Sequence, residues 1–384
     1  MEQGLLVNLI LALAAGLLGA MVAVRLRQSV MLGYIAAGIA IGPFTPGLVG
    51  DLATVQALAQ IGIIFLLFAI GVQFSLRDLF RVGKVALAGA VGQVLAVIGL
   101  GYLLGLALGW PPLSALFLGA VASNSSSTVL GKVLGERGEV DSLPGRVALA
   151  WSSLQDLGTV LLIVVLSALA SEVGWQPLDL AWALGKAGLF LLLLIPLGLR
   201  VFPALFDKVA ELRNREVFLI TVTAVALGTA YVASLFGISL ALGAFIAGIA
   251  VSESDLSYHI VGEIAPLRDI FAGLFFVSIG MLVDPAAIAA NVVPVVLALF
   301  LIIVVKGALS ALITLAGRYS LRTALLTGAI LAQSAEFSFL LARLGSDLGV
   351  LSASAFAIVL AATAISVVTA PYCYDAAQAL GRRA

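Results

Sequence analysis

Charged side chains are scarce in this sequence. Lysine, arginine, aspartate and glutamate make up 10% of the 384 residues, whereas a soluble domain averages about 25%. The twenty basic and twenty acidic residues cancel to a net charge of zero, so we expect no nucleic-acid partner. The single cysteine, Cys373, excludes an internal disulfide. We also find no nucleotide-binding glycine motif, no low-complexity linker and no soluble domain.

Apolar residues predominate in this sequence. They make up 62% of the chain, and the mean hydropathy is +1.20. A helix needs about 20 apolar residues to cross a bilayer. That length predicts thirteen transmembrane helices, at 5–24, 30–48, 55–74, 85–108, 113–134, 146–170, 180–205, 217–235, 238–252, 264–283, 292–316, 321–344 and 352–374. The sequence therefore predicts an all-α polytopic membrane protein, surrounded by lipid.

Basic residues predict its orientation. If the N-terminus lies outside, every lysine and arginine except Lys186, Lys306 and Arg343 falls in or beside an inner loop. The positive-inside rule then holds along the whole chain. We expect an integral protein of a bacterial inner membrane, with its C-terminus in the cytoplasm.

Three short segments recur at one offset, which predicts an internal duplication. The offset of 209–210 residues spans seven helices, an odd number, so the second copy enters the membrane from the opposite side, as in many secondary transporters. We expect repeat 1 at about 30–170 and repeat 2 at about 238–374, with helices 85–170 and 292–374 as the transport core and the remainder as scaffold and dimer interface. The matching segments are 36–40 with 246–250, 67–71 with 276–280, and 134–140 with 344–350.

Polar residues interrupt two helices that correspond in this duplication. One is broken by the run Ser123, Asn124, Ser125, Ser126, Ser127 and Thr128, and the other by Gln333, Ser334 and Glu336. Unwound backbone at membrane depth is tolerated where it is buried in protein or lines a wet cavity. Paired breaks point to a transport site, although serine and threonine can also serve a helix interface.

Asp156 lies within the apolar run 147–170, directly after Gln155. A carboxylate at that depth is costly, and it usually marks an ion or proton pathway. The alternative is a structural ion pair. Lys306 lies centrally in 292–316, where it could serve as a counter-charge to Asp156 or to the negative helix ends, or carry a proton itself. For Glu336 we favour a supporting role that offsets two positive helix ends.

These motifs together resemble the monovalent cation:proton antiporter family 2, and within it the Kef-type potassium/proton antiporters. The motifs are the segment 30–43, the Ser/Asn-rich break, Gln155-Asp156, the segment 275–281, Lys306 and the segment 333–337. The resemblance covers the whole chain. It implies a sodium/proton antiporter-like fold, a homodimer, and two discontinuous helices that cross at their breaks beside Asp156.

The chain departs from that family pattern in two ways. Electrogenic sodium antiporters carry two adjacent aspartates where this chain has Gln155-Asp156, so we expect an electroneutral exchange and leave the partner of Lys306 open. Kef-type proteins also carry a C-terminal nucleotide-binding domain, whereas this sequence ends at Ala384. It is therefore either a naturally short protein or a membrane domain whose regulatory domain or subunit lies outside this sequence.

We therefore predict a secondary antiporter, not an enzyme, that exchanges K⁺ (favoured) or Na⁺ for H⁺ without a cofactor. The monovalent cation would bind at Asp156, with oxygen ligands from Gln155 and residues 123–128; Lys306, Glu336, Gln333 and Ser334 would support the breaks. Alternatives are a sodium-coupled symporter of an organic anion and a gated potassium efflux channel. An intramembrane enzyme is disfavoured, because neither paired aspartates nor a nucleophile with its base is present.

Overall fold

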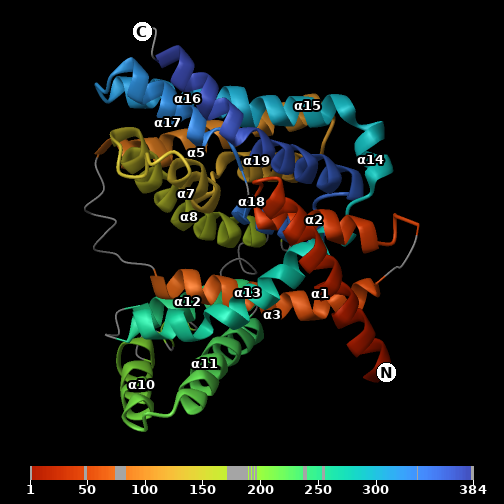
Figure 1. Cartoon of the computed structure of the whole chain (residues 1–384), viewed down its shortest axis with the longest axis vertical. Coiled ribbons are helices and arrows are strands. Elements are labelled where there is room, and N and C mark those ends of the chain that lie inside the picture. Colours follow the sequence, from red (N-terminus) through yellow and green to blue (C-terminus); the bar gives the residue numbers. More distant parts are fainter. Residues whose placement is uncertain are drawn as a thin grey trace. The chain divides into compact units, whose positions relative to one another are not determined.

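The computed structural model describes residues 2–46, 50–73, 84–170, 189, 192, 194, 197–236, 240–252, 256–334 and 336–381. Within these ranges the elements are helices, as the composition predicts (Figure 1). The chain divides into two compact units. Unit 1 comprises Met1–Val22, Gly33–Asp78 and Glu172–Met281, and unit 2 comprises Ala23–Leu32, Leu79–Ser171 and Leu282–Ala384.

Unit 1 contains the N-terminal helices and those in the middle of the chain. Most residues of the first two helices belong to it. Its elements are α1 (Glu2–Arg25), α2 (Val30–Ile41), α3 (Leu52–Gln73), the π-helix η1 (Leu197–Val201), α10 (Phe202–Glu211), α11 (Arg215–Leu235), α12 (Leu240–Ser252) and α13 (Ser257–Met281).

Glycines let the helices of unit 1 approach closely. A Cβ atom on Gly38 of α2 would lie 2.0 Å from the Val277 carbonyl oxygen of α13, beside Gly280. Gly71 of α3 meets Gly248 of α12 in the same way. The duplication relates Gly38 to Gly248 and Gly71 to Gly280, so these two contacts correspond to each other.

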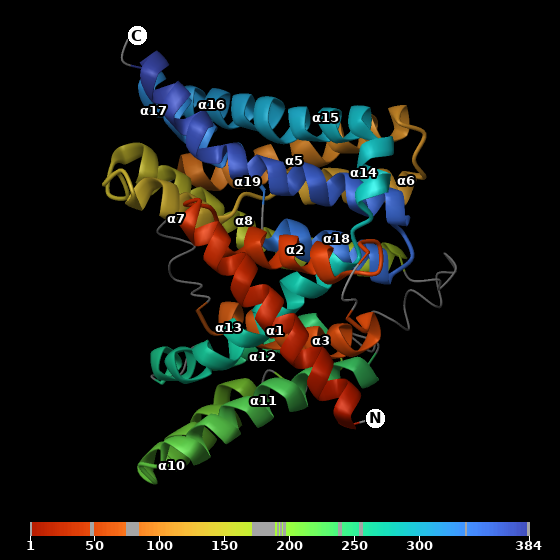
Figure 2. The same ribbon diagram turned by 45° about the vertical axis from the view of Figure 1, so that its right-hand side comes forward.

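Unit 2 contains the two interrupted helices. Its elements are α5 (Lys84–Ala107), α6 (Pro112–Ser123), α7 (Ser127–Gly135), α8 (Leu143–Ala170), α14 (Pro285–Ala290), α15 (Val292–Phe300), the π-helix η2 (Leu301–Val305), α16 (Lys306–Ala316), α17 (Leu321–Leu331), α18 (Glu336–Asp347) and α19 (Ala353–Gly381). Helices α15 and α16 continue one another through η2 and lie along α5 and α19 (Figure 2).

Nine helices among the described residues are long and apolar enough to cross a membrane, or ten if the bent pair α17–α18 forms one span. Most of the expected helix at 180–205 lies outside the described residues, so the count of thirteen stays a prediction. Helix α2 ends at Ile41 rather than at residue 48, because Gly42 and Pro43 follow it and the residue before a proline is disfavoured in a helix. Helix α13 begins seven residues before the expected 264 and contains Pro266.

Candidate functional site

The two interruptions lie side by side in unit 2. Helix α6 ends at Ser123 and α7 begins at Ser127, while α17 ends at Leu331 and α18 begins at Glu336. The Ser125 hydroxyl donates to the Leu331 carbonyl at 2.8 Å. The Gln333 side chain accepts from the Ser126 amide at 3.3 Å and donates to the Ser126 carbonyl at 3.0 Å. Each break therefore satisfies backbone groups that the other leaves open.

Lys306 donates hydrogen bonds to backbone carbonyl groups in both breaks. Its side chain is 0% exposed, and its Nζ atom donates to the Asn124 carbonyl (2.7 Å), the Gln333 carbonyl (2.8 Å) and the Ser334 hydroxyl (2.8 Å). Three acceptors match the three N–H bonds of an ammonium group. Among the described residues no salt bridge joins Lys306 to Asp156. Of the two partners left open by the sequence, the structure places Lys306 on the negative helix ends.

Asp156 lies on α8 beside the first break, next to the N-terminus of α7. Its Oδ2 atom accepts from the Ser127 hydroxyl at 3.0 Å, and the Asn124 side chain also interacts with the carboxylate. The Asn124 Nδ2 atom donates to the Thr159 hydroxyl at 2.6 Å, and that hydroxyl donates to the Gln155 carbonyl at 2.8 Å. Since the Thr159 hydroxyl donates to Gln155, it accepts from the amide nitrogen of Asn124.

Three buried oxygen atoms around Asp156 lack a donor. Among the described residues, no hydrogen-bond partner reaches Asp156 Oδ1, Asn124 Oδ1 or Gln155 Oε1. A buried acceptor without a donor is destabilising unless a proton, an ion or water satisfies it. Carboxylate and amide oxygens are the kinds of ligand that hard cations take. Asp156 Oδ1 can therefore be satisfied by a proton or by a cation, and the two amide oxygens are candidate further ligands for a cation.

Glu336 lies at the first residue of α18. The Thr128 hydroxyl, near the N-terminus of α7, donates to Glu336 Oε1 at 2.9 Å. Carboxylates are stabilised at helix N-termini, so this placement suits the supporting role expected from the sequence.

The remaining predicted ligands face other partners. Ser123 donates its hydroxyl to the Ala120 carbonyl of its own helix. The Ser126 hydroxyl caps α7 by accepting from the Val129 amide, and the Ser334 hydroxyl donates to the Asn124 carbonyl. Within the run 123–128, only Asn124 and Ser127 are brought to the Asp156 side chain.

Sequence reasoning did not single out three polar residues that complete this network. Gln93 of α5, Thr159 of α8 and Ser366 of α19 are all buried and hydrogen-bonded to the breaks or to the residues beside Asp156. Gln93 is an isolated polar residue in an apolar stretch of its helix, whereas Thr159 and Ser366 lie near other polar residues of theirs. A lone polar side chain does not reveal which distant segment it contacts.

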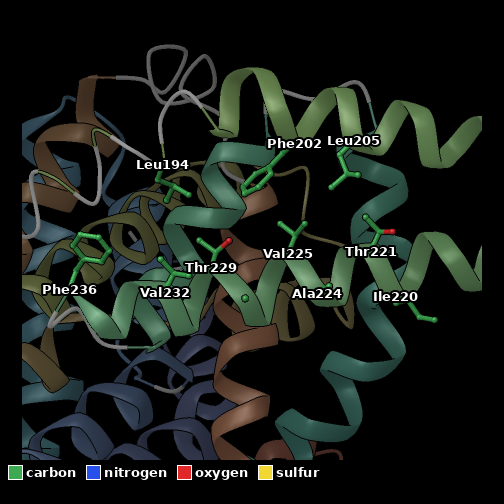
Figure 3. Close-up of a pocket in the computed structure, with 11 residues that line it drawn as sticks. Leu194, Phe202, Leu205, Ile220, Thr221, Ala224, Val225, Thr229, Val232 and Phe236 are labelled. Carbon is green, nitrogen blue, oxygen red and sulfur yellow. The ribbon is translucent and has the colours of Figure 1, made fainter.

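Unit 1 contains a cavity of another kind. It has a volume of about 720 Å³ and lies beside α11, where its walls are formed almost wholly by aliphatic and aromatic side chains such as Phe202, Ile220 and Phe236 (Figure 3). Thr221 and Thr229 are its polar lining residues. None of the described residues that line this cavity is a carboxylate, so they offer an alkali cation no counter-charge.

Interrupted helices that meet inside an apolar bundle, next to a half-buried carboxylate, define the class of polytopic secondary transporters. The family model for the sodium/hydrogen exchanger, transmembrane, matches residues 9–374. The chain therefore belongs to the sodium/hydrogen exchanger family and is an integral membrane protein.

Two relatives and one solved structure extend this result. The Escherichia coli (strain K12) protein YbaL, a cation/proton antiporter by name, is 38% identical over 372 residues, which cover 95% of this chain and 66% of YbaL. K⁺ efflux antiporter 5 of Arabidopsis thaliana is 32% identical over 377 residues, covering 96% and 65%. This sequence thus spans about two thirds of the length of either relative. The Kef-type resemblance is confirmed.

The structure of the sodium proton antiporter MjNhaP1 from Methanocaldococcus jannaschii matches this fold with a TM-score of 0.72 at 20% identity. The match covers 99% of this chain and all of that one. The predicted all-α antiporter-like fold is therefore confirmed.

Proposed function

We propose that this protein exchanges a monovalent cation for a proton, with both competing for Asp156. The observation that carries this proposal is the set of three buried oxygens without donors, on Asp156, Asn124 and Gln155. The family membership and the names of the two relatives support it.

The exchange follows from the cost of charge inside the membrane. An unpaired carboxylate is penalised at that depth, so Asp156 is favoured when it carries either a proton or a cation. The empty, charged form is the least able to move through the membrane interior. Cation and proton therefore alternate at the site, and alternating access exposes it to each side in turn. Lys306 stays bound to carbonyl oxygens in this scheme and carries no proton.

The cation we favour is K⁺. Two of the three open oxygens are neutral amides, which suits a weakly hydrated cation, and the Arabidopsis relative is named a K⁺ efflux antiporter. With one aspartate at the site, one cation replaces one proton and the exchange is electroneutral. We also propose a homodimer in a bacterial inner membrane, with the N-terminus outside, helices 85–170 and 292–374 as the transport core, and regulation by a domain or subunit outside this sequence.

The test is Asp156→Asn in proteoliposomes that contain a pH-sensitive dye. We expect this variant to lose proton movement driven by K⁺ or Na⁺ while remaining folded, because asparagine cannot exchange a proton. Asp141→Asn, at an exposed position in the same unit, is the matched control and should exchange normally. Retained exchange in Asp156→Asn would end the proposal.

Titrating Li⁺, Na⁺, K⁺ and Rb⁺ with and without an imposed voltage reports selectivity and stoichiometry. A rate that responds to voltage would refute electroneutrality. Uptake of a labelled organic anion would indicate symport, and a current that reverses at the potential of a single ion would indicate a channel.

A further inference from the structure

We propose that Gln93, held by Trp151, is a positioning residue that turns the side-chain oxygen of Gln155 toward the cation. This inference rests on the proposed function and adds to it a determinant of cation affinity and selectivity. Gln93 and Trp151 are each 0% exposed, and Gln155 is 1% exposed. The three side chains form one chain of hydrogen bonds between α5 and α8.

The indole of Trp151 settles the orientation of the Gln93 amide. Its Nε1 atom lies 3.4 Å from Gln93 Oε1, and an indole N–H can only donate. At the other end, Gln93 Nε2 donates to the Ser123 carbonyl at 3.0 Å, which can only accept. A flipped Gln93 would oppose donor to donor and acceptor to acceptor, so only one orientation satisfies both neighbours.

Gln93 in turn settles the orientation of Gln155. The Gln155 Nε2 atom donates to Gln93 Oε1 and, at 3.3 Å, to the Ser123 carbonyl. Both neighbours are acceptors, so the amide nitrogen must face them and the oxygen must face away. Within the described part of the chain, that Oε1 atom is buried without a donor. The hydrogen-bond chain therefore fixes a neutral, buried oxygen, without a donor among the described residues, on the residue that directly precedes Asp156.

Gly89 provides the space for the indole. A Cβ atom on Gly89 would lie 2.3–2.5 Å from three ring atoms of Trp151, closer than any real contact. Gly89 precedes Gln93 by about one turn of α5, so the same helix seats the ring and supplies the amide that the ring orients.

A cation and a proton respond differently to this arrangement. A dehydrated cation gathers several oxygen ligands, whereas a proton binds to the carboxylate alone. Misdirecting the Gln155 oxygen should therefore weaken cation binding and change the rank order of cations, with little effect on proton binding. A merely structural role would lower the amount of active protein and leave KM and the rank order unchanged.

The experiment uses the full chain in proteoliposomes and measures exchange against K⁺ and Na⁺ concentration. Trp151→Phe removes the N–H but keeps a ring against Gly89, and Gln93→Met removes the amide at similar length. We expect both to raise the cation KM about three- to tenfold, as for the loss of one oriented hydrogen bond, with kcat within about twofold. Trp110→Phe, in the loop between α5 and α6, is the matched control.

A double variant separates positioning from packing. If Gln93 acts through Gln155, then Gln93→Met combined with Gln155→Met should be no worse than Gln155→Met alone. Additive effects, or a wild-type KM and rank order in both Trp151→Phe and Gln93→Met, would overturn the inference. If Gln93→Met does not fold, the milder Trp151→Phe decides the same question. If Asp156→Asn loses exchange while the Gln93 and Trp151 variants keep the wild-type KM and rank order, this inference alone is rejected. If Asp156→Asn retains exchange, the proposed function itself is rejected.

Discussion

Replacing Lys306 by alanine should destabilise the protein more than it impairs transport. The ammonium group is buried and donates to two backbone carbonyls and one hydroxyl. A hydrogen bond from a charged group contributes about 1.5–3 kcal/mol, so losing the two carbonyl contacts costs about 3–6 kcal/mol. In a chain of 384 residues, each kcal/mol moves Tm by about 2 °C or less. The expected decrease is roughly 5–10 °C.

Thermal unfolding of the purified protein in detergent, followed by tryptophan fluorescence, measures this decrease. Lys306→Met keeps most of the apolar stem and separates the lost hydrogen bonds from the cavity that alanine leaves. Lys132→Ala is the matched control, because Lys132 also donates to one carbonyl, that of Gln28, at 2.7 Å. Lys132 is only partly buried, so water can replace it at a cost within about 1 kcal/mol.

The transport assay completes the comparison. We expect partial exchange activity in Lys306→Ala in proportion to the folded protein, because Asp156 and its open oxygens remain. If Lys306→Ala and Lys306→Met both unfold within 2 °C of the wild type but abolish exchange, the reasoning from the helix ends is wrong. Lys306 would then act directly on the transported proton.

Two further predictions concern unit 1. Gly38→Ala should destabilise this unit by about 1–3 kcal/mol, because the new Cβ would lie 2.0 Å from a backbone oxygen of α13. The control is Gly99→Ala in α5 of unit 2, where a Cβ meets nothing within 4 Å; it should raise Tm slightly. Equal changes of Tm in the two variants would contradict this prediction. Hydrogen bonds from the Thr54 hydroxyl and amide lower the pKa of Asp51 at the start of α3. Its stabilisation is therefore complete above the ordinary aspartate pKa of about 3.9 and is lost as pH falls through the lowered value. Asp51→Ala should reduce Tm at pH 7, by an amount that shrinks below about pH 4, and a pH-independent difference would refute the assignment.

The interruptions of the helices could be located from the sequence because polar residues at membrane depth are conspicuous. The run 123–128 and the residues 333–336 mark breaks that the structure places at 124–126 and between Leu331 and Glu336. The C-terminal end of α2 is harder to predict, because a count of apolar residues continues past Gly42 and Pro43, whereas the helix ends at Ile41.

Partners across long sequence separations could not be predicted. Lys306 was recognised as unusual, but its contacts lie 182 residues away at Asn124 and 27 residues away at Gln333. Composition cannot distinguish a carboxylate from a carbonyl as its partner, because both satisfy an ammonium group. The role of Gln93 cannot be predicted for the same reason, since its hydrogen-bond partners Trp151 and Gln155 lie on a different helix.

The duplication also relates the acidic Asp156 to a neutral residue. At the offset of 210 residues, Ser366 in α19 takes the position that Asp156 has in α8. The Ser366 hydroxyl accepts from the Ser334 amide at 3.0 Å and can donate to the Thr363 carbonyl at 2.7 Å. At the position that corresponds to Asp156, a neutral hydroxyl therefore satisfies the backbone of the second break.

Asp156 faces the first break instead, where the carbonyl of Asn124 is satisfied by Lys306 but the side-chain oxygens of Asp156 and Asn124 are not all satisfied. The two breaks correspond in the duplication, but their charges are not distributed equally. Asp156 lies beside the first break, Glu336 begins the helix after the second, and Lys306 contacts both. Among the described residues, Asp156 carries an acidic oxygen without a donor, whereas Ser366 is a neutral hydroxyl with hydrogen-bond partners, so we place the proposed exchange of a cation for a proton at the first break.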